Sequence, residues 1–188
     1  MNNKVANPKA LGFGVLAVAF WMFSLAHAGL VRPAGIDPGT MHVTMTLATL
    51  GLLIAGIMAF LREEGWSAFF FLFWAGMAWG SAHGMGHDMM PATREFNGWF
   101  AIAITLVNLY LWFGAFKTKS IGGAVSLTVL LLWLSLLGLG LSFFFNSVVL
   151  ERIGGILGLI GAVVAFYVSA ASMCPVNLPG APKGNNAG

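Results

Sequence analysis

The stretch IGGAVSLTVLLLWLSLLGLGLSFFF, Ile121–Phe145, decides the fold of this chain. It holds no Asp, Glu, Lys or Arg, and as a helix it would cross the roughly 30 Å hydrocarbon core of a bilayer. Five other stretches also lack these charged residues: Leu11–Leu30, Met41–Leu61, Trp66–Ser81, Trp99–Phe116 and Ile153–Met173. The shortest of them, Trp66–Ser81, reaches spanning length only if its helix runs on to Met90.

These stretches predict helices rather than membrane strands. In lipid every backbone amide needs a partner within the protein, so only helices and closed barrels span a bilayer. Barrel strands are about half as long and alternate apolar with polar residues, and these stretches do not alternate. The sequence therefore predicts an all-α integral membrane bundle of six transmembrane helices over residues 11–173. A cytoplasmic segment, 1–10, precedes it, and a loose cytoplasmic tail, 174–188, follows.

The composition agrees with a membrane protein of one domain. Hydrophobic residues make up 59% of the chain and charged residues 8%, against about 25% charged in a soluble domain. The net charge of +3 comes from basic residues in the loops, so it does not indicate nucleic-acid binding. The single cysteine, Cys174, excludes a disulfide within the chain. No nucleophile–base pair or carboxylate pair is visible, so we do not expect an enzyme.

The basic residues also predict the orientation in the membrane. With the N-terminus in the cytoplasm, six Lys and Arg residues fall on the inner side and three on the outer side, and short cytoplasmic loops carry such an excess. We therefore expect a multi-pass protein of the plasma (inner) membrane with both termini cytoplasmic. The inner residues are Lys4, Lys9, Arg62, Lys117, Lys119 and Lys183, and the outer residues are Arg32, Arg94 and Arg152.

Small residues recur four apart on two of the predicted helices. Gly76, Gly80 and Gly84 share one helix face, and so do Gly154, Gly158 and Ala162. Such faces let helix backbones approach closely in lipid. Both stripes therefore predict helix contacts.

One polar residue lies deep in a span. Asn108 is in the middle of Trp99–Phe116, and a buried amide in lipid needs a partner on another helix or a wet pathway. No Asp or Glu lies deep in any span, so a proton relay through a buried carboxylate is not expected. Any proton coupling would use His, groups at helix ends, or the protonated acid itself as cargo.

The four histidines all fall near the predicted outer ends of the first three spans. His83 and His87 are four apart and share a helix face, with Met85 and Asp88 beside them. Imidazole and thioether together suit copper. His42 and His27 would join the group from neighbouring helices. A metal site, a pH-sensitive outer vestibule and plain packing all remain as interpretations.

Several motifs resemble one family of membrane proteins. The residues Asn7–Phe13, NPKALGF, are similar to the amino-terminal signature of the acetate uptake transporters, also called succinate–acetate permeases. Phe113–Lys117, Leu127–Leu130 and Gly154–Ala162 resemble stretches of that family's fourth, fifth and sixth helices. The likeness covers most of the chain.

The resemblance implies a function and a set of pathway residues. Family members form hexamers in which each protomer has its own pore for acetate or related small carboxylates, by proton coupling or as a channel. No cofactor is expected, and the partners would be a small carboxylate, membrane lipid and further copies of the chain. The implied pathway begins at Asn7, Pro8, Leu11 and Gly12, and its constriction would use Leu16 or its neighbours Phe13 and Phe20, Trp74 or Gly76, and Leu127. Asn108 joins the expected pathway because it is a polar residue within a span, and not through the resemblance.

Two other functions stay open at this point. The chain could instead hold copper or haem near His83 and His87, as an accessory subunit of a larger complex. It could also be a channel for a neutral small solute such as urea or an amide. Metal analysis tests the first alternative, and acetate uptake with and without a pH gradient tests the second.

Overall fold

The structure is a computed structural model, and it describes residues 6–31, 37–84, 93–118, 121–173 and 179. These residues form six α-helices and no strand. The all-α bundle predicted from the sequence is confirmed. The helices are α1 (Pro8–His27), α2 (Pro38–Leu61), α3 (Gly65–Gly84), α4 (Arg94–Lys117), α5 (Gly123–Phe145) and α6 (Val148–Met173).

Five of the six helices are long and apolar enough to cross a membrane: α1, α2, α4, α5 and α6. α3 has 20 residues, but its Trp, Gly and Ser residues lower its mean hydropathy. The extension of this helix to Met90 falls outside the described residues. So does the tail, apart from Pro179.

Five of the six helices begin before the charge-free stretches that predicted them, all except α5. α1 starts at Pro8, because the side chain of Asn7 accepts a hydrogen bond from the backbone N–H of Lys9 at 3.0 Å and caps the helix. α6 starts at Val148, so Val148–Arg152, which precede the charge-free stretch Ile153–Met173, are also helical. The link between α5 and α6 is short because Asn146, at φ 48°, ends α5 in the left-handed conformation that Asn tolerates.

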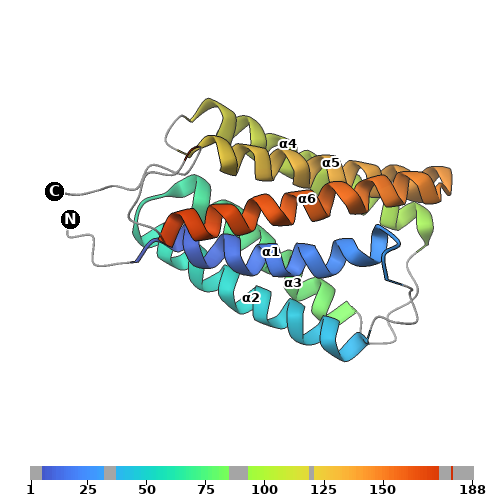
Figure 1. The fold of residues 1–188 in the computed structure, drawn as a ribbon, viewed down its shortest axis with the longest axis horizontal. Helices are drawn as coiled ribbons and strands as arrows, with labels where there is room; N and C mark the ends of the chain where they lie inside the picture. The colour runs from blue at the N-terminus through green and yellow to red at the C-terminus, as the bar shows by residue number, and fades with distance from the viewer. Residues whose placement is uncertain (1–5, 32–36, 85–92, 119–120, 174–178, 180–188) are drawn as a thin grey trace.

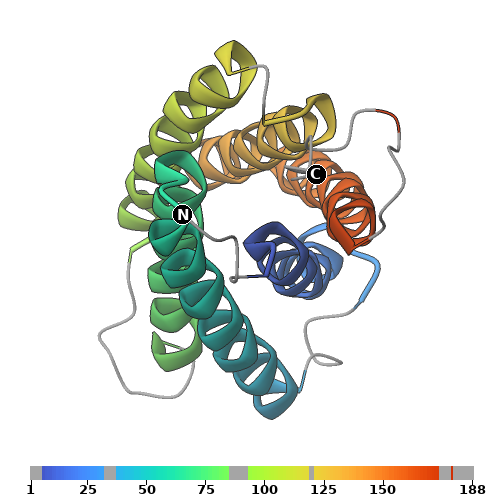
Figure 2. The same cartoon turned by 90° about the vertical axis from the view of Figure 1, so that its left-hand side faces the viewer.

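The helices form a ring when the bundle is viewed along its length (Figure 2). α1 packs on α2 and α6, α2 on α3, α6 on α5 and α5 on α4, while α3 and α4 close the ring with little contact. Consecutive helices run in opposite directions (Figure 1). We call the end with the starts of α1, α3 and α5 the Lys9 end, and the opposite end the His27 end.

The small residues of α6 make the closest helix contacts, as predicted for Gly154 and Gly158. A Cβ on Gly154 would lie 2.8 Å from the Ser135 backbone oxygen of α5, and one on Gly158 would overlap Ser24 of α1. Hydrogen bonds add to these contacts. Ser135 Oγ donates to the Gly154 carbonyl at 2.7 Å, and Ser169 Oγ of α6 donates to the Ala10 carbonyl at 2.6 Å.

The same prediction is wrong for the α3 stripe within this chain. A Cβ on Gly76 or Gly80 would meet nothing within 4 Å, and both glycines are exposed. The 3.6-residue period correctly put them on one face, but that face points away from the bundle.

Candidate pore

A cavity of about 240 Å³ lies inside the ring of helices. A water molecule needs about 10–15 Å³ of such space, so the cavity has room for several waters or a small solute. α1 to α5 all contribute to its wall, which is mostly aliphatic and aromatic. The polar side chains of the wall are those of His27, Trp74, Ser81 and Asn97.

Aromatic residues of α1 and α3 form the middle of the wall. Phe20 and Trp74 meet edge to face with ring centroids 4.9 Å apart, and both are almost fully buried. The Nε1 atom of Trp74 has no hydrogen-bond partner among the described residues. A buried donor without a partner is costly, so this indole N–H would gain free energy from any acceptor that reached it.

A cluster of three phenylalanines closes the bundle on the Lys9 side of the cavity. Phe13, Phe70 and Phe71 are each 0% exposed, and their ring centroids lie 5.3–5.6 Å apart. Gly12 makes this packing possible, because a Cβ there would overlap the Phe71 ring. We call these three residues the phenylalanine plug.

His27, the last residue of α1, contributes to the cavity wall at the end opposite Lys9. Its Nδ1 lies 3.0 Å from Oε1 of Glu151 on α6, and its ring is 4.5 Å from that of Phe23. The contact with Glu151 ties the end of α1 to the start of α6. It also fixes the imidazole at the cavity wall.

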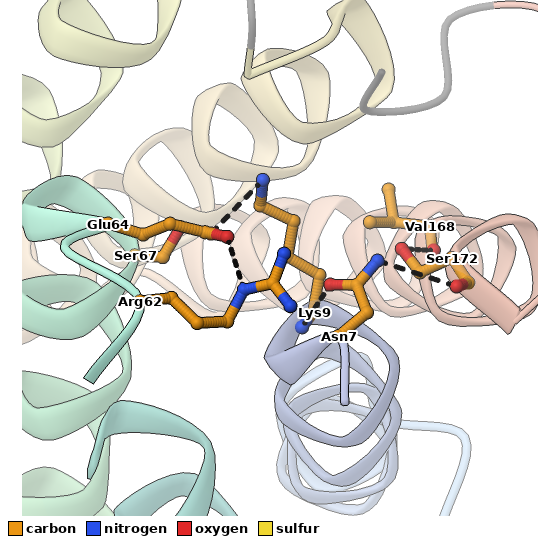
Figure 3. Close-up of polar contacts among 7 residues, drawn as sticks. All are labelled: Asn7, Lys9, Arg62, Glu64, Ser67, Val168 and Ser172. Carbon is orange, nitrogen blue, oxygen red and sulfur yellow. Dashed lines mark hydrogen bonds and ion pairs between the residues drawn. The ribbon is translucent and has the colours of Figure 1, made fainter. Parts of the chain in front are cut away.

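A charged network lies at the Lys9 end (Figure 3). Glu64, in the turn between α2 and α3, accepts from Arg62 Nε at 3.0 Å and lies 3.3 Å from Lys9 Nζ. Ser67 Oγ donates to the same carboxylate at 3.2 Å. Asn7 faces the other way, and its Nδ2 donates to the Ser172 carbonyl of α6 at 3.4 Å.

The structure brings together only some of the predicted pathway residues. Leu16, Trp74 and the neighbour Phe20 line the cavity, while Phe13 and Gly12 belong to the plug and its contacts. Leu127 is 44% exposed on α5 and does not line the cavity. Leu11 and Gly76 are likewise exposed and absent from its wall. Asn7 and Pro8 lie at the Lys9 end, below the plug.

Asn108 is fully buried, one turn from the cavity residue Ile104. Its Nδ2 donates to the Ile104 carbonyl of its own helix at 2.9 Å. Its Oδ1 has no partner within the described residues. The bond to another helix that its position suggested is therefore not seen in this part of the chain.

The histidines separate into two places. His42 and His83 come together from α2 and α3, with ring centroids 6.1 Å apart, whereas His27 is engaged by Glu151. Across the described residues, no group of three or more His, Cys, Asp or Glu side chains could hold a metal ion. A copper site thus has no support here, and Met85, His87 and Asp88 lie outside the described residues.

Sequence reasoning missed the wall contributed by α2, α4 and α5. Leu52, Ile104 and Leu136 line the cavity but look like any other apolar residue of a span. The Lys9–Glu64 contact was also missed, because the two residues are far apart in sequence. The sequence offered one signal for this contact: an acidic residue, Glu64, in a turn and a basic residue, Lys9, at a helix start, both expected on the same side of the membrane.

Comparison with known proteins identifies the fold. No protein-family profile matches the sequence, and no curated protein matches it. The structure is nevertheless similar to that of the bacterial acetate channel SatP, with a TM-score of 0.81 over 93% of this chain and 100% of that chain. The two sequences are 16% identical. The chain therefore has the six-helix fold of that channel.

Proposed function

We propose that this chain is a membrane channel or transporter for a small monocarboxylate such as acetate, and a divergent member of the acetate uptake transporter family. The cavity carries the proposal. It lies inside a fold shared with an acetate channel, its wall is mostly apolar, and it is lined by Trp74, whose buried indole N–H has no partner among the described residues. The alkyl end of a small carboxylate suits the apolar wall, and its carboxylate end suits the N–H donor.

The cavity also bears on the form in which the solute passes. An isolated carboxylate is costly to bury in apolar surroundings, and the wall described here includes no Asp or Glu. The solute would lower this cost either by accepting the Trp74 N–H or by crossing as the protonated acid. In the second case the acid carries its own proton, and uptake rises with an inward proton gradient.

The assembly and orientation follow the same proposal. The chain would form a hexamer in the plasma membrane, as the family resemblance implies, and its many exposed large apolar side chains would then face lipid or a partner chain. Its Lys9 end would face the cytoplasm, because Lys9, Arg62 and Lys117 gather there. Single cysteines in a Cys174→Ser background test this. Thr118→Cys should react with a membrane-impermeant reagent only in opened vesicles, and Ser147→Cys also in intact cells.

Reconstitution tests the function directly. The purified full chain is placed in proteoliposomes, and entry of radiolabelled acetate and urea is measured with and without a pH gradient. We expect acetate entry well above that of empty liposomes, and none for urea. Urea entry without acetate entry would favour the neutral-solute channel, and entry of neither would reject transport of both solutes.

A further inference from the structure

The carboxylate of Glu64 is surrounded by hydrogen-bond donors and positive charges at the Lys9 end (Figure 3). Three donors from separate parts of the chain surround it: Lys9 of α1, Arg62 after α2 and Ser67 of α3. They lie 3.3, 3.0 and 3.2 Å from its oxygens. Guanidinium, ammonium and hydroxyl groups are the usual protein partners of a carboxylate.

The donors are well sheltered for a helix end. The side chains of Lys9 and Arg62 are only 13% and 16% exposed, and Ser67 is 3% exposed. The site also lies near the phenylalanine plug in sequence position. Lys9 shares a helix face with Phe13, and Ser67 with Phe70 and Phe71, because each plug residue follows three or four positions later. The site therefore lies about one helical turn from the plug, toward the Lys9 end.

The charges of the site favour the binding of an anion. Lys9 and Arg62 are positive and Glu64 is negative, so these three side chains together carry one positive charge. Burial of Glu64 by itself would raise its pKa, but Lys9 and Arg62 outweigh this and lower the pKa below its ordinary value of 4.5. Glu64 is therefore ionised at neutral pH.

Backbone hydrogen bonds hold the turn in place, while the Glu64 side chain is partly exposed. The backbone N–H of Glu64 donates to the Ala59 carbonyl, and the Glu64 carbonyl accepts from Ala68. The side chain is 24% exposed. Rotation of this side chain alone would vacate the donors without any change in the backbone of the turn.

We propose that Lys9, Arg62 and Ser67 form a carboxylate-binding site at the Lys9 end of the pore, in which Glu64 is a tethered internal ligand that the transported monocarboxylate displaces. The inference rests on the proposed function for the identity of the solute. It predicts that Glu64 competes with acetate. A tethered competitor acts at an effective concentration in the millimolar range.

Equilibrium dialysis of ¹⁴C-acetate against the purified full-length protein tests this. Glu64→Gln removes the competing charge and keeps the side-chain size, so acetate affinity should rise roughly tenfold. Glu63→Gln is the matched control, because Glu63 is the neighbouring exposed carboxylate at φ 61° and takes no part in the network. Its affinity should equal that of the unaltered protein. Adding Lys9→Gln to Glu64→Gln should abolish the gain.

Acetate entry into proteoliposomes of the unaltered protein is measured alongside. Equal affinities for Glu64→Gln and Glu63→Gln, with acetate entry intact, would overturn the site and leave the channel standing. A gain for Glu64→Gln without acetate entry would overturn the channel and keep the site. A gain that survives Lys9→Gln would also overturn the site, because acetate would then be binding elsewhere.

Discussion

The indole of Trp74 on α3 stands edge to face against the ring of Phe20 on α1, with centroids 4.9 Å apart. This contact holds the Trp74 ring in the cavity wall and leaves its Nε1 without a partner among the described residues. The ring closes the apolar wall. Under the proposed function, its N–H is the donor that a passing carboxylate would use.

Trp74→Phe should slow acetate entry. The substitution keeps an aromatic ring but removes the donor, and a hydrogen bond to a charged group contributes about 1.5–3 kcal/mol, which corresponds to at least roughly a tenfold change. Entry of radiolabelled acetate into proteoliposomes measures it. Trp133→Phe is the control, since the Trp133 indole also lacks a described partner but does not line the cavity. Equal slowing by both variants would show that Trp74 acts through packing alone.

The span positions could be predicted because they depend on a local property. A bilayer demands about 20 apolar residues in a row, and such a run is visible in the sequence without any knowledge of its neighbours. The Asn7 cap was predictable for the same reason, since Asn before Pro at a helix start uses only adjacent residues.

The pore wall was harder to predict because all helix faces are apolar in a membrane protein. Leu127 and Leu136 look alike in sequence, yet Leu136 is 7% exposed and lines the cavity, whereas Leu127 is 44% exposed. Gly76 and Gly158 likewise share the same spacing signal, but only Gly158 meets another helix. The rotation of each helix about its axis decides these cases, and hydrophobic periodicity is weak where lipid and core are equally apolar.

Leu136→Ala should broaden the range of acids that enter. Shortening this side chain enlarges the cavity, so a larger acid such as butyrate should enter faster relative to acetate. A cavity-forming substitution of this kind costs about 2–5 kcal/mol, so thermal unfolding is recorded for the same samples. Leu127→Ala should keep the original preference. A broadened preference from Leu127→Ala alone would place the pathway at that residue, as the family resemblance implied.

Gly155→Ala should destabilise the fold. A Cβ on Gly155 would overlap the backbone of His27 and Ala28 at the end of α1, and backbone cannot move aside as a flexible side chain does. We expect a loss of about 1–3 kcal/mol, seen as a lower unfolding temperature in detergent. Gly80→Ala has open space around it and should be neutral or slightly stabilising. If both variants unfold at the same temperature, the close approach of α1 to α6 is not as described.

Neutralising Glu64 should make stability less dependent on acid. Lys9 and Arg62 hold the pKa of Glu64 below its ordinary value of 4.5 even though burial opposes them. A carboxylate with a lowered pKa in the folded state stabilises the protein above pH 4.5, and this contribution disappears as the pH falls through the lowered pKa. The unfolding temperature of the unaltered protein should therefore exceed that of Glu64→Gln at pH 7, and the gap should shrink below pH 4.5. Asp37 also has a lowered pKa, because the side chain and backbone of Thr40 donate to it, but it is present in both proteins and cancels in the difference.

Glu63→Gln should follow the unaltered protein at every pH. A gap between the unaltered protein and Glu64→Gln that stays constant from pH 7 to pH 3.5 would mean that the charge of Glu64 contributes nothing to folding, and that its contacts with Lys9 and Arg62 do not persist in solution.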